Sequence, residues 1–69
     1  MTKRRWNGRE HVENLKVDNF IADILSVYRK HNMSISHEDE HGAFVIQPIS
    51  DINIEWLENA HDETEVPSA

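Results

Sequence analysis

Residues 33–48 read MSISHEDEHGAFVIQP, and this stretch decides the fold because two strand-like patterns flank a glycine-closed turn. Apolar residues alternate with serines up to His37, which is the two-residue period of a β-strand. After Gly42, the run AFVI at residues 43–46 is rich in strand-forming types, and the pattern ends at Pro48. The stretch therefore predicts a β-hairpin.

A turn of four residues that ends at Gly42, with this glycine at positive φ, fixes the register expected for the hairpin. The expected pairs are Glu38 with Ala43, His37 with Phe44, and Ile35 with Ile46. A slip of one residue would turn His37 to the opposite face.

A helix is predicted on each side of the hairpin. Before it, apolar residues recur with helical spacing at Val17, Phe20, Ile21, Ile24, Leu25 and Tyr28. This helix should begin between Glu10 and Val17 and stop at Asn32, a residue type that tolerates the left-handed conformation. After the hairpin, Ser50 or Asp51 can cap a second helix. The expected core side of that helix consists of Ile52, Trp56, Leu57 and Ala60.

The predicted fold class is α+β, with an α-β-β-α order and two helices packed on one face of a β-hairpin. We expect a single domain over residues 11–62, a flexible basic arm at residues 1–10 and a disordered acidic tail at residues 63–69. A chain this short buries only about 60% of its unfolded surface, and a two-stranded sheet has two open edges. A homodimer formed through a sheet edge or through Trp56 is therefore a reasonable expectation.

The net charge of −6 is unevenly distributed along the chain. Residues 1–30 contain all seven basic side chains and four acids, which gives them a net charge of +3. Residues 31–69 contain nine acids and no lysine or arginine, which gives them −9. Such a dipole can steer a basic partner toward one end, although a run of like charges is often only a solvated surface.

The composition excludes several classes of site. The chain has no cysteine, so disulfides and thiolate zinc sites are excluded, and any metal would depend on imidazole and carboxylate groups. The N-terminus MTKRRWNGRE is followed by no apolar leader, and no stretch approaches the ~20 apolar residues of a membrane span. We therefore expect a cytoplasmic protein without a cofactor.

Residues 37–41 (HEDEH) match H-E-x-x-H, the string that places two histidine ligands and a catalytic glutamate on one helix of zinc proteases. Here Gly42 follows directly and strand patterns lie on both sides, so no helix is expected, and a minimal zinc hydrolase is disfavoured. A non-catalytic metal or small-molecule site, with His37 and His41 brought together at the hairpin tip, is the main alternative. Without such a site, His37 would be a partly buried histidine beside Phe44, and His41 an exposed turn residue.

The N-terminal arm mixes Trp6 with the cations Lys3, Arg4, Arg5 and Arg9, and such a mixture can contact phosphates and stack on a base. The strongly acidic remainder of the chain would repel nucleic acid, so direct binding is disfavoured. Complementary charge instead favours an acidic half that occupies a basic groove on a protein.

The strings Ile35-Ser36-His37-Glu38-Asp39, His41-Gly42-Ala43-Phe44 and Trp56-Leu57 with Ala60 resemble a pattern in short uncharacterised proteins of bacteriophages and prophages. In that family a first helix leads to a hairpin with an H-E-D-x-H-G-A-F core, and a W-L-x-x-A helix follows. The resemblance covers roughly residues 20–62. It implies an accessory protein that binds a host macromolecule, and it implies no transferable activity.

We predict a non-catalytic accessory protein that binds and inhibits or modulates a host protein. The partner would be basic or nucleic-acid-binding, for example a defence or nucleic-acid-processing enzyme, because one half of the chain is acidic. The predicted binding residues are His37, Glu38, Asp39, Glu40 and His41 in the loop, and Asp51, Glu55, Glu58, Asp62 and Glu63 after it.

Overall fold

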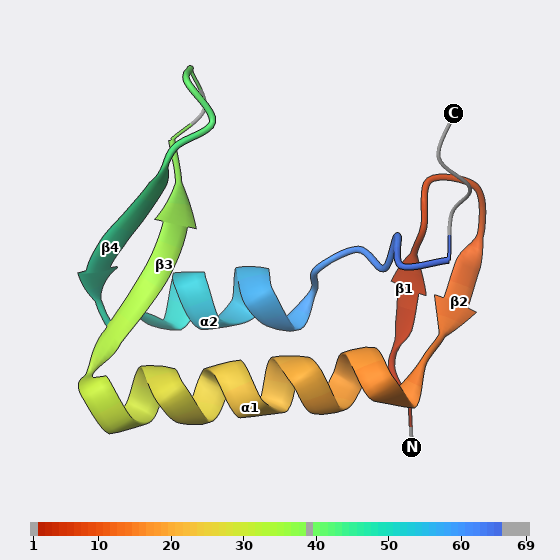
Figure 1. Ribbon diagram of the computed structural model, residues 1–69, viewed down its shortest axis with the longest axis horizontal. Helices are drawn as coiled ribbons and strands as arrows, with labels where there is room; N and C mark the ends of the chain where they lie inside the picture. The colour runs from red at the N-terminus through yellow and green to blue at the C-terminus, as the bar shows by residue number, and fades with distance from the viewer. Residues whose placement is uncertain (1, 39, 66–69) are drawn as a thin grey trace.

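The computed structural model describes residues 2–38 and 40–65, which form two helices and two separate β-hairpins (Figure 1). In chain order the elements are β1 (Arg4–Trp6), β2 (His11–Glu13), α1 (Leu15–His31), β3 (Met33–His37), β4 (Phe44–Pro48) and α2 (Asp51–Glu58). The predicted α+β class is confirmed, and an additional hairpin precedes the predicted α-β-β-α order. No described helix is long and apolar enough to cross a membrane.

The additional hairpin lies where the sequence analysis expects a flexible arm, at residues 1–10, and β1 pairs antiparallel with β2. Its turn has a local cause. The side-chain oxygen of Asn7 accepts hydrogen bonds from the amides of Arg9 and Glu10, each 2.8 Å long. Gly8 adopts φ +100, a conformation that costs glycine little. Asn-Gly is a strong hairpin signal, and the prediction of a flexible arm did not take it into account.

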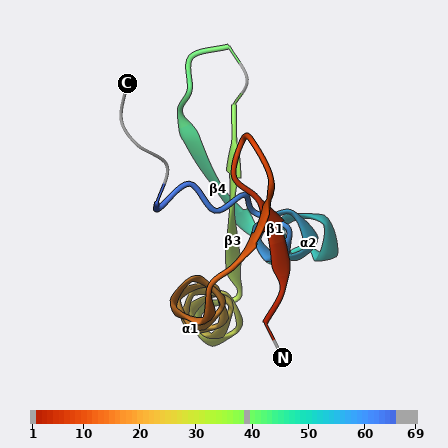
Figure 2. The same cartoon turned by 90° about the vertical axis from the view of Figure 1, so that its right-hand side faces the viewer.

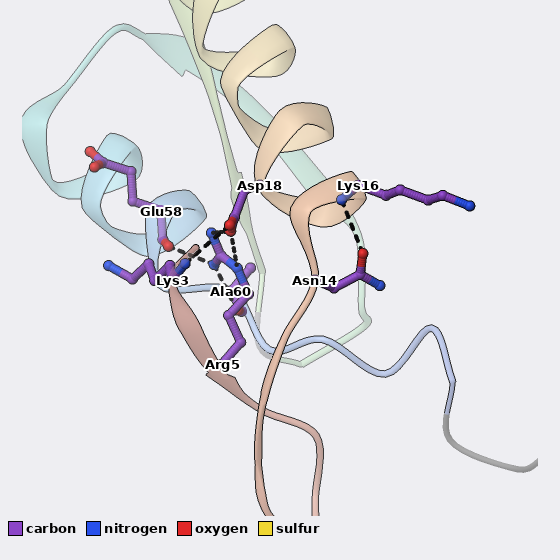
Figure 3. Close-up of polar contacts among 7 residues, drawn as sticks. All are labelled: Lys3, Arg5, Asn14, Lys16, Asp18, Glu58 and Ala60. Atoms are coloured by element: carbon purple, nitrogen blue, oxygen red, sulfur yellow. Dashed lines mark hydrogen bonds and ion pairs between the residues drawn. The ribbon is translucent and has the colours of Figure 1, made fainter. Parts of the chain in front are cut away.

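Helix α1 has the expected apolar pattern and ends at the expected residue. The Asn14 side chain accepts a hydrogen bond from the Lys16 amide at 3.0 Å, which caps the first turn (Figure 3). At the other end Asn32 has φ 57, and its amide donates to the Tyr28 carbonyl. The predicted left-handed stop at Asn32 is confirmed.

The core is small. Among the described residues, the buried apolar side chains are Ile21, Leu25 and Tyr28. Half-buried residues pack around them, namely Val17, Ile24, Ile49, Ile54, Leu57 and Ala60. Phe20 belongs to the same predicted stripe but is 65% exposed. The apolar stripe of α1 is therefore wider than the surface that the neighbouring elements cover.

The second hairpin has the predicted register, with Ile35 opposite Ile46 and His37 opposite Phe44. The Glu38 amide donates to the Ala43 carbonyl at 2.8 Å, which closes the ladder before the turn. Gly42 adopts φ +71, the positive value that the turn requires.

The two helices reach β3 in different ways, and in the view of Figure 2 they lie to either side of this strand. From α1, the Tyr28 hydroxyl donates to the Ile35 carbonyl at 3.4 Å. From α2, the Asn53 side-chain amide donates to Ser34 Oγ and Gln47 Oε1, each at 2.9 Å. Ser34 is fully buried under this contact. Apart from β3, no described element brings a Cα atom within 8 Å of β4.

After α2, residues 59–65 return to the N-terminal hairpin (Figure 1). The Asp62 amide donates to the Trp6 carbonyl at 3.0 Å, so this segment runs beside β1. Of the tail predicted to be disordered, residues 66–69 lie outside the described residues, and the prediction is not tested there.

Candidate interaction surface

Helix α2 carries an acidic stripe, which we define as Asp51, Glu55 and Glu58. Their spacing of four and three residues places them on one side of the helix, and all three are exposed. Ser50 caps the helix by accepting from the Asn53 amide at 3.2 Å. The cap confirms the predicted start, and Asp51 in the first turn interacts favourably with the helix dipole.

Two large apolar side chains lie beside the acidic stripe. Ile52 is 60% exposed and Trp56 is 56% exposed, although the sequence analysis places both on the core side of the helix. That part of the prediction is wrong, because Asn53 is buried instead and its two side-chain hydrogen bonds to the hairpin set the rotation of α2. The exposed side of α2 therefore combines negative charge with apolar surface.

Asp62, predicted to lie on the binding surface, is only 5% exposed. Its carboxylate accepts from the Thr64 hydroxyl at 2.6 Å and from the Thr64 amide at 3.0 Å. These bonds, with the nearby Arg5 guanidinium and Asn14 side chain, hold the pKa of Asp62 below its usual value. Asp62 therefore holds the C-terminal segment in place, and little of its surface is exposed. Glu63 is exposed, and it directly follows Asp62, whose amide donates to the Trp6 carbonyl of β1.

The loop is organised by Glu38. Its carboxylate accepts from the amides of Glu40 at 2.7 Å and His41 at 2.8 Å. These two backbone hydrogen bonds lower the pKa of Glu38, and the bond from the Glu40 amide has the larger effect. The His41 ring lies 3.2 Å from the same carboxylate through Nδ1. The fifth predicted loop residue, Asp39, lies outside the described residues.

The two histidines of HEDEH have different surroundings. His37 ends β3, and its ring centroid lies 6.0 Å from that of Trp56. The predicted position of His37 opposite Phe44 is correct, but the side chain is exposed. His41 instead groups with Glu38 and Glu40, whose potential ligand atoms all lie within 4.8 Å of one another. Within the described part of the loop, the cluster that could hold a cation therefore does not include His37.

The described residues of HEDEH are not helical: His37 is in a strand, and residues 40 and 41 are in a turn. Two histidines four residues apart converge on one metal when a helix carries them. The geometry of the zinc-protease motif is thus not present in this part of the chain.

An apolar groove of about 470 Å³ lies between α1, the hairpin and α2. Its largest side chains are Phe20 and Tyr28 from α1, Ile35 and Phe44 from the hairpin, and Trp56 from α2. A smaller hollow of about 250 Å³ continues it over Val27, Met33 and Ile46. The sequence signal for this surface was the width of the apolar stripe on α1, which exceeds what a short hairpin can cover.

Arg5 has a structural role that the sequence analysis did not identify. Its side chain is 4% exposed, and Nε and Nη2 lie 3.3 and 3.2 Å from Oδ1 of Asp18 (Figure 3). Nη1 donates to the carbonyls of Glu58 at 2.6 Å and Ala60 at 3.0 Å. Arg5 thus satisfies carbonyls at the end of α2 that the helix leaves without partners. No local sequence signal distinguishes it from Arg4, which is exposed.

Comparison with known proteins adds no family assignment. The chain matches no protein-family model, and no curated protein and no solved structure is significantly similar to it. The functional argument therefore depends on the surface that α2 and the hairpin present.

Proposed function

We propose that this chain is a non-catalytic protein-binding module that docks on a basic surface of another protein through α2. The observation that carries the proposal is the acidic stripe of α2 next to the exposed Ile52 and Trp56. The resemblance to phage and prophage proteins suggests the context. In that context the partner is a host protein of the bacterial cytoplasm, such as a defence or nucleic-acid-processing enzyme, which the module inhibits or modulates.

The chemistry of this surface suits protein recognition. Exposed tryptophans are enriched among the residues that dominate binding energy, because one ring buries a large apolar area in a partner's pocket. The flanking carboxylates add attraction to a basic patch, which speeds association and sets orientation. The described residues from 31 onward include no lysine or arginine, so no cation of this half competes for the carboxylates.

The loop alternative receives less support from the geometry. A cation at Glu38, Glu40 and His41 would compete for the Glu38 carboxylate, which already accepts from two backbone amides. Those hydrogen bonds account for the arrangement of the loop without a bound ion.

Charge reversal of the acidic stripe tests the proposal. The tagged wild-type chain, the triple variant Asp51→Lys, Glu55→Lys, Glu58→Lys, and a control triple variant are used to capture proteins from a bacterial lysate at increasing salt. The control, Glu10→Lys, Glu13→Lys, Asp23→Lys, changes the net charge equally at exposed acids outside α2. We expect proteins that the wild type and the control retain and that the α2 variant loses, with retention that falls as salt rises.

Trp56→Ala provides a second comparison, with Trp6→Ala as its control. Truncating a tryptophan at the centre of an interface costs at least about 2 kcal/mol, a loss of roughly 30-fold in affinity. Retention that is equal for the wild type, the α2 charge variant and Trp56→Ala would contradict the proposal.

A further inference from the structure

The outer edge of β4 presents backbone groups that have no partner among the described residues. In an antiparallel pair, hydrogen-bonded and non-hydrogen-bonded positions alternate. The bond from the Glu38 amide to the Ala43 carbonyl fixes this alternation, so the amides and carbonyls of Ile35 and Ile46 point away from the ladder. The Tyr28 hydroxyl, which reaches the Ile35 carbonyl from outside, agrees with this assignment. On β4 the outward groups therefore belong to Phe44 and Ile46.

Nothing in the described chain protects this edge. Phe44 is 78% exposed and Ile46 is 63% exposed, and residues 43–48 contain no charged side chain. Apart from β3, no described element brings a Cα atom within 8 Å of β4, and the hydrogen bond from Asn53 of α2 reaches Gln47 and not Phe44 or Ile46. Strand β4 lies at the margin of the molecule in Figure 1. Proteins usually protect an edge strand with charges, a bulge, a proline or a covering element. The one proline, Pro48, lies at the last position of the strand and leaves the middle open.

We propose that a second copy of this chain covers the edge, with the two β4 strands paired antiparallel about a twofold axis at Val45. Phe44 of each copy then lies opposite Ile46 of the other. Their amides and carbonyls exchange hydrogen bonds, and the two hairpins join in one continuous sheet. Aromatic and β-branched residues directly opposite each other are favourable cross-strand pairs.

The neighbouring registers are worse for backbone reasons. A twofold axis at Ile46 would place Phe44 opposite Pro48, which has no amide to donate. A twofold axis at Phe44 would place Ile46 opposite Gly42, whose φ of +71 is not that of an extended strand. The axis at Val45 is the arrangement in which all outward groups of Phe44 and Ile46 are satisfied.

The exposed area fits a second copy. The chain exposes 5716 Å², with a mass of 8.1 kDa. A compact monomer of that mass exposes about 4500 Å², so roughly 1200 Å² is in excess. Each partner in a standard interface buries about 800 Å². Edge pairing together with the adjacent apolar side chains can account for an area of this size.

The charges also fit an antiparallel arrangement. The tip of each hairpin, with Glu38 and Glu40, would extend past the base of the other hairpin. That base lies next to the last turn of α1, because the Ile49 amide donates to the Asn32 carbonyl at 3.2 Å. The last turn of α1 carries Arg29, Lys30 and His31. The acidic tip of one copy thus approaches the basic helix end of the other, and three basic side chains there outnumber the one acid at the same base, Asp51.

Disulfide trapping tests the register. The wild-type chain has no cysteine, so a single introduced cysteine can form a disulfide only between copies. Val45→Cys would lie opposite itself in a non-hydrogen-bonded pair with a Cα separation of about 4.5 Å, which is within the range for a disulfide. Ala43→Cys lies on the same face of the hairpin strand at an exposed position, but the two copies would be about 13 Å apart along the sheet. We expect near-complete dimer trapping for Val45→Cys in a glutathione buffer and little for Ala43→Cys.

A second variant tests the edge without disturbing the hairpin. The Ile46 amide points outward, so Ile46→Pro removes only a bond between copies, whereas Ile46→Thr keeps the amide and serves as the control. Sedimentation from micromolar to millimolar concentration should show a dimer of the wild-type chain. Ile46→Pro should raise the dissociation constant of this dimer on the order of 30-fold, because two hydrogen bonds between copies are lost. A wild-type chain that is monomeric throughout, or equal trapping of the two cysteine variants, would overturn the proposal. Either result would indicate that the edge of β4 is free to pair with a strand of a different protein.

Discussion

The guanidinium of Arg5 donates to the Asp18 carboxylate on α1 and to the carbonyls of Glu58 and Ala60. One side chain therefore joins the N-terminal hairpin, the first turns of α1 and the end of α2. A buried cation is stable only when its donors are satisfied, and here the carboxylate and the carbonyls provide that compensation. The planar geometry of arginine allows one residue to bond to several acceptors at once, which a lysine ammonium cannot reproduce.

We expect Arg5→Lys to lower the free energy of unfolding by about 1–3 kcal/mol, because several charge-assisted hydrogen bonds are lost. Arg4→Lys, at the exposed neighbour in the same strand, should change it by less than about 0.5 kcal/mol. Urea titrations followed by tryptophan fluorescence measure both values. Equal effects of the two substitutions would show that the contacts of Arg5 contribute nothing specific.

At the scale of elements, the local stop and start signals are the best determined features of this chain. Helix α1 ends at Asn32 because its left-handed conformation directs the Asn32 amide back to the Tyr28 carbonyl. Helix α2 begins after Ser50, whose side chain satisfies the Asn53 amide. The stretch between these residues is long enough for one hairpin, so both ends of the β3–β4 unit are fixed by local chemistry.

Asn32 allows a direct test of this stop. Its φ of 57 is unfavourable for most residues with a Cβ atom, and asparagine tolerates it better than alanine because its short polar side chain can hydrogen-bond locally. Asn32→Ala should therefore destabilise the fold by about 1 kcal/mol, while Asn32→Gly should not. At Asn59, the last capping residue of α2, φ is −99, and glycine should there be the less stable of the two. Thermal unfolding of the four variants gives the comparison. A glycine that is worse than alanine at both positions would contradict a left-handed cap at Asn32.

At the scale of the whole molecule, the described chain leaves much of its apolar surface uncovered. Its buried apolar side chains are few, while Phe20, Phe44, Ile46 and Trp56 are each more than half exposed. Such a surface is typical of a protein that functions in association with another chain. The edge of β4 and the exposed side of α2 meet at the apolar groove that Phe44 and Trp56 both line, so a second copy on one surface would lie next to a partner on the other.

The proposed dimer predicts a charge swap between copies. Lys30→Glu alone and Glu40→Lys alone should each weaken association about two- to five-fold, the range expected for exposed ion pairs. The double variant should restore it, because the pair is reversed and not lost. Lys16→Glu, at the opposite end of α1, should leave association unchanged. Sedimentation equilibrium at low salt measures the association of all four variants. A double variant whose association is weakened by the sum of the two single effects would refute the contact between Lys30 and Glu40.

The sequence by itself determined the local features: the strand alternation and register of β3 and β4, the helical spacing of α1, and the caps at Asn32 and Ser50. These depend on neighbours within a few residues, so their signals lie in short strings. The Asn7-Gly8 turn signal is also present in the sequence, but the strands beside it are too short to show an alternating pattern, so the sequence predicts a flexible arm there.

Only the tertiary structure decided which face of α2 is buried, because the rotation of that helix depends on the hydrogen bond from Asn53 to Ser34, which lies 19 residues away in sequence. The burial of Arg5 and Asp62 is likewise a tertiary feature, because it depends on the return of residues 59–62 to β1. The structure also separates His37, which lies in a strand, from the cluster of Glu38, Glu40 and His41 at the turn. Contacts between distant segments have no local signature, since many alternative pairings would satisfy the same hydrophobic and charge pattern.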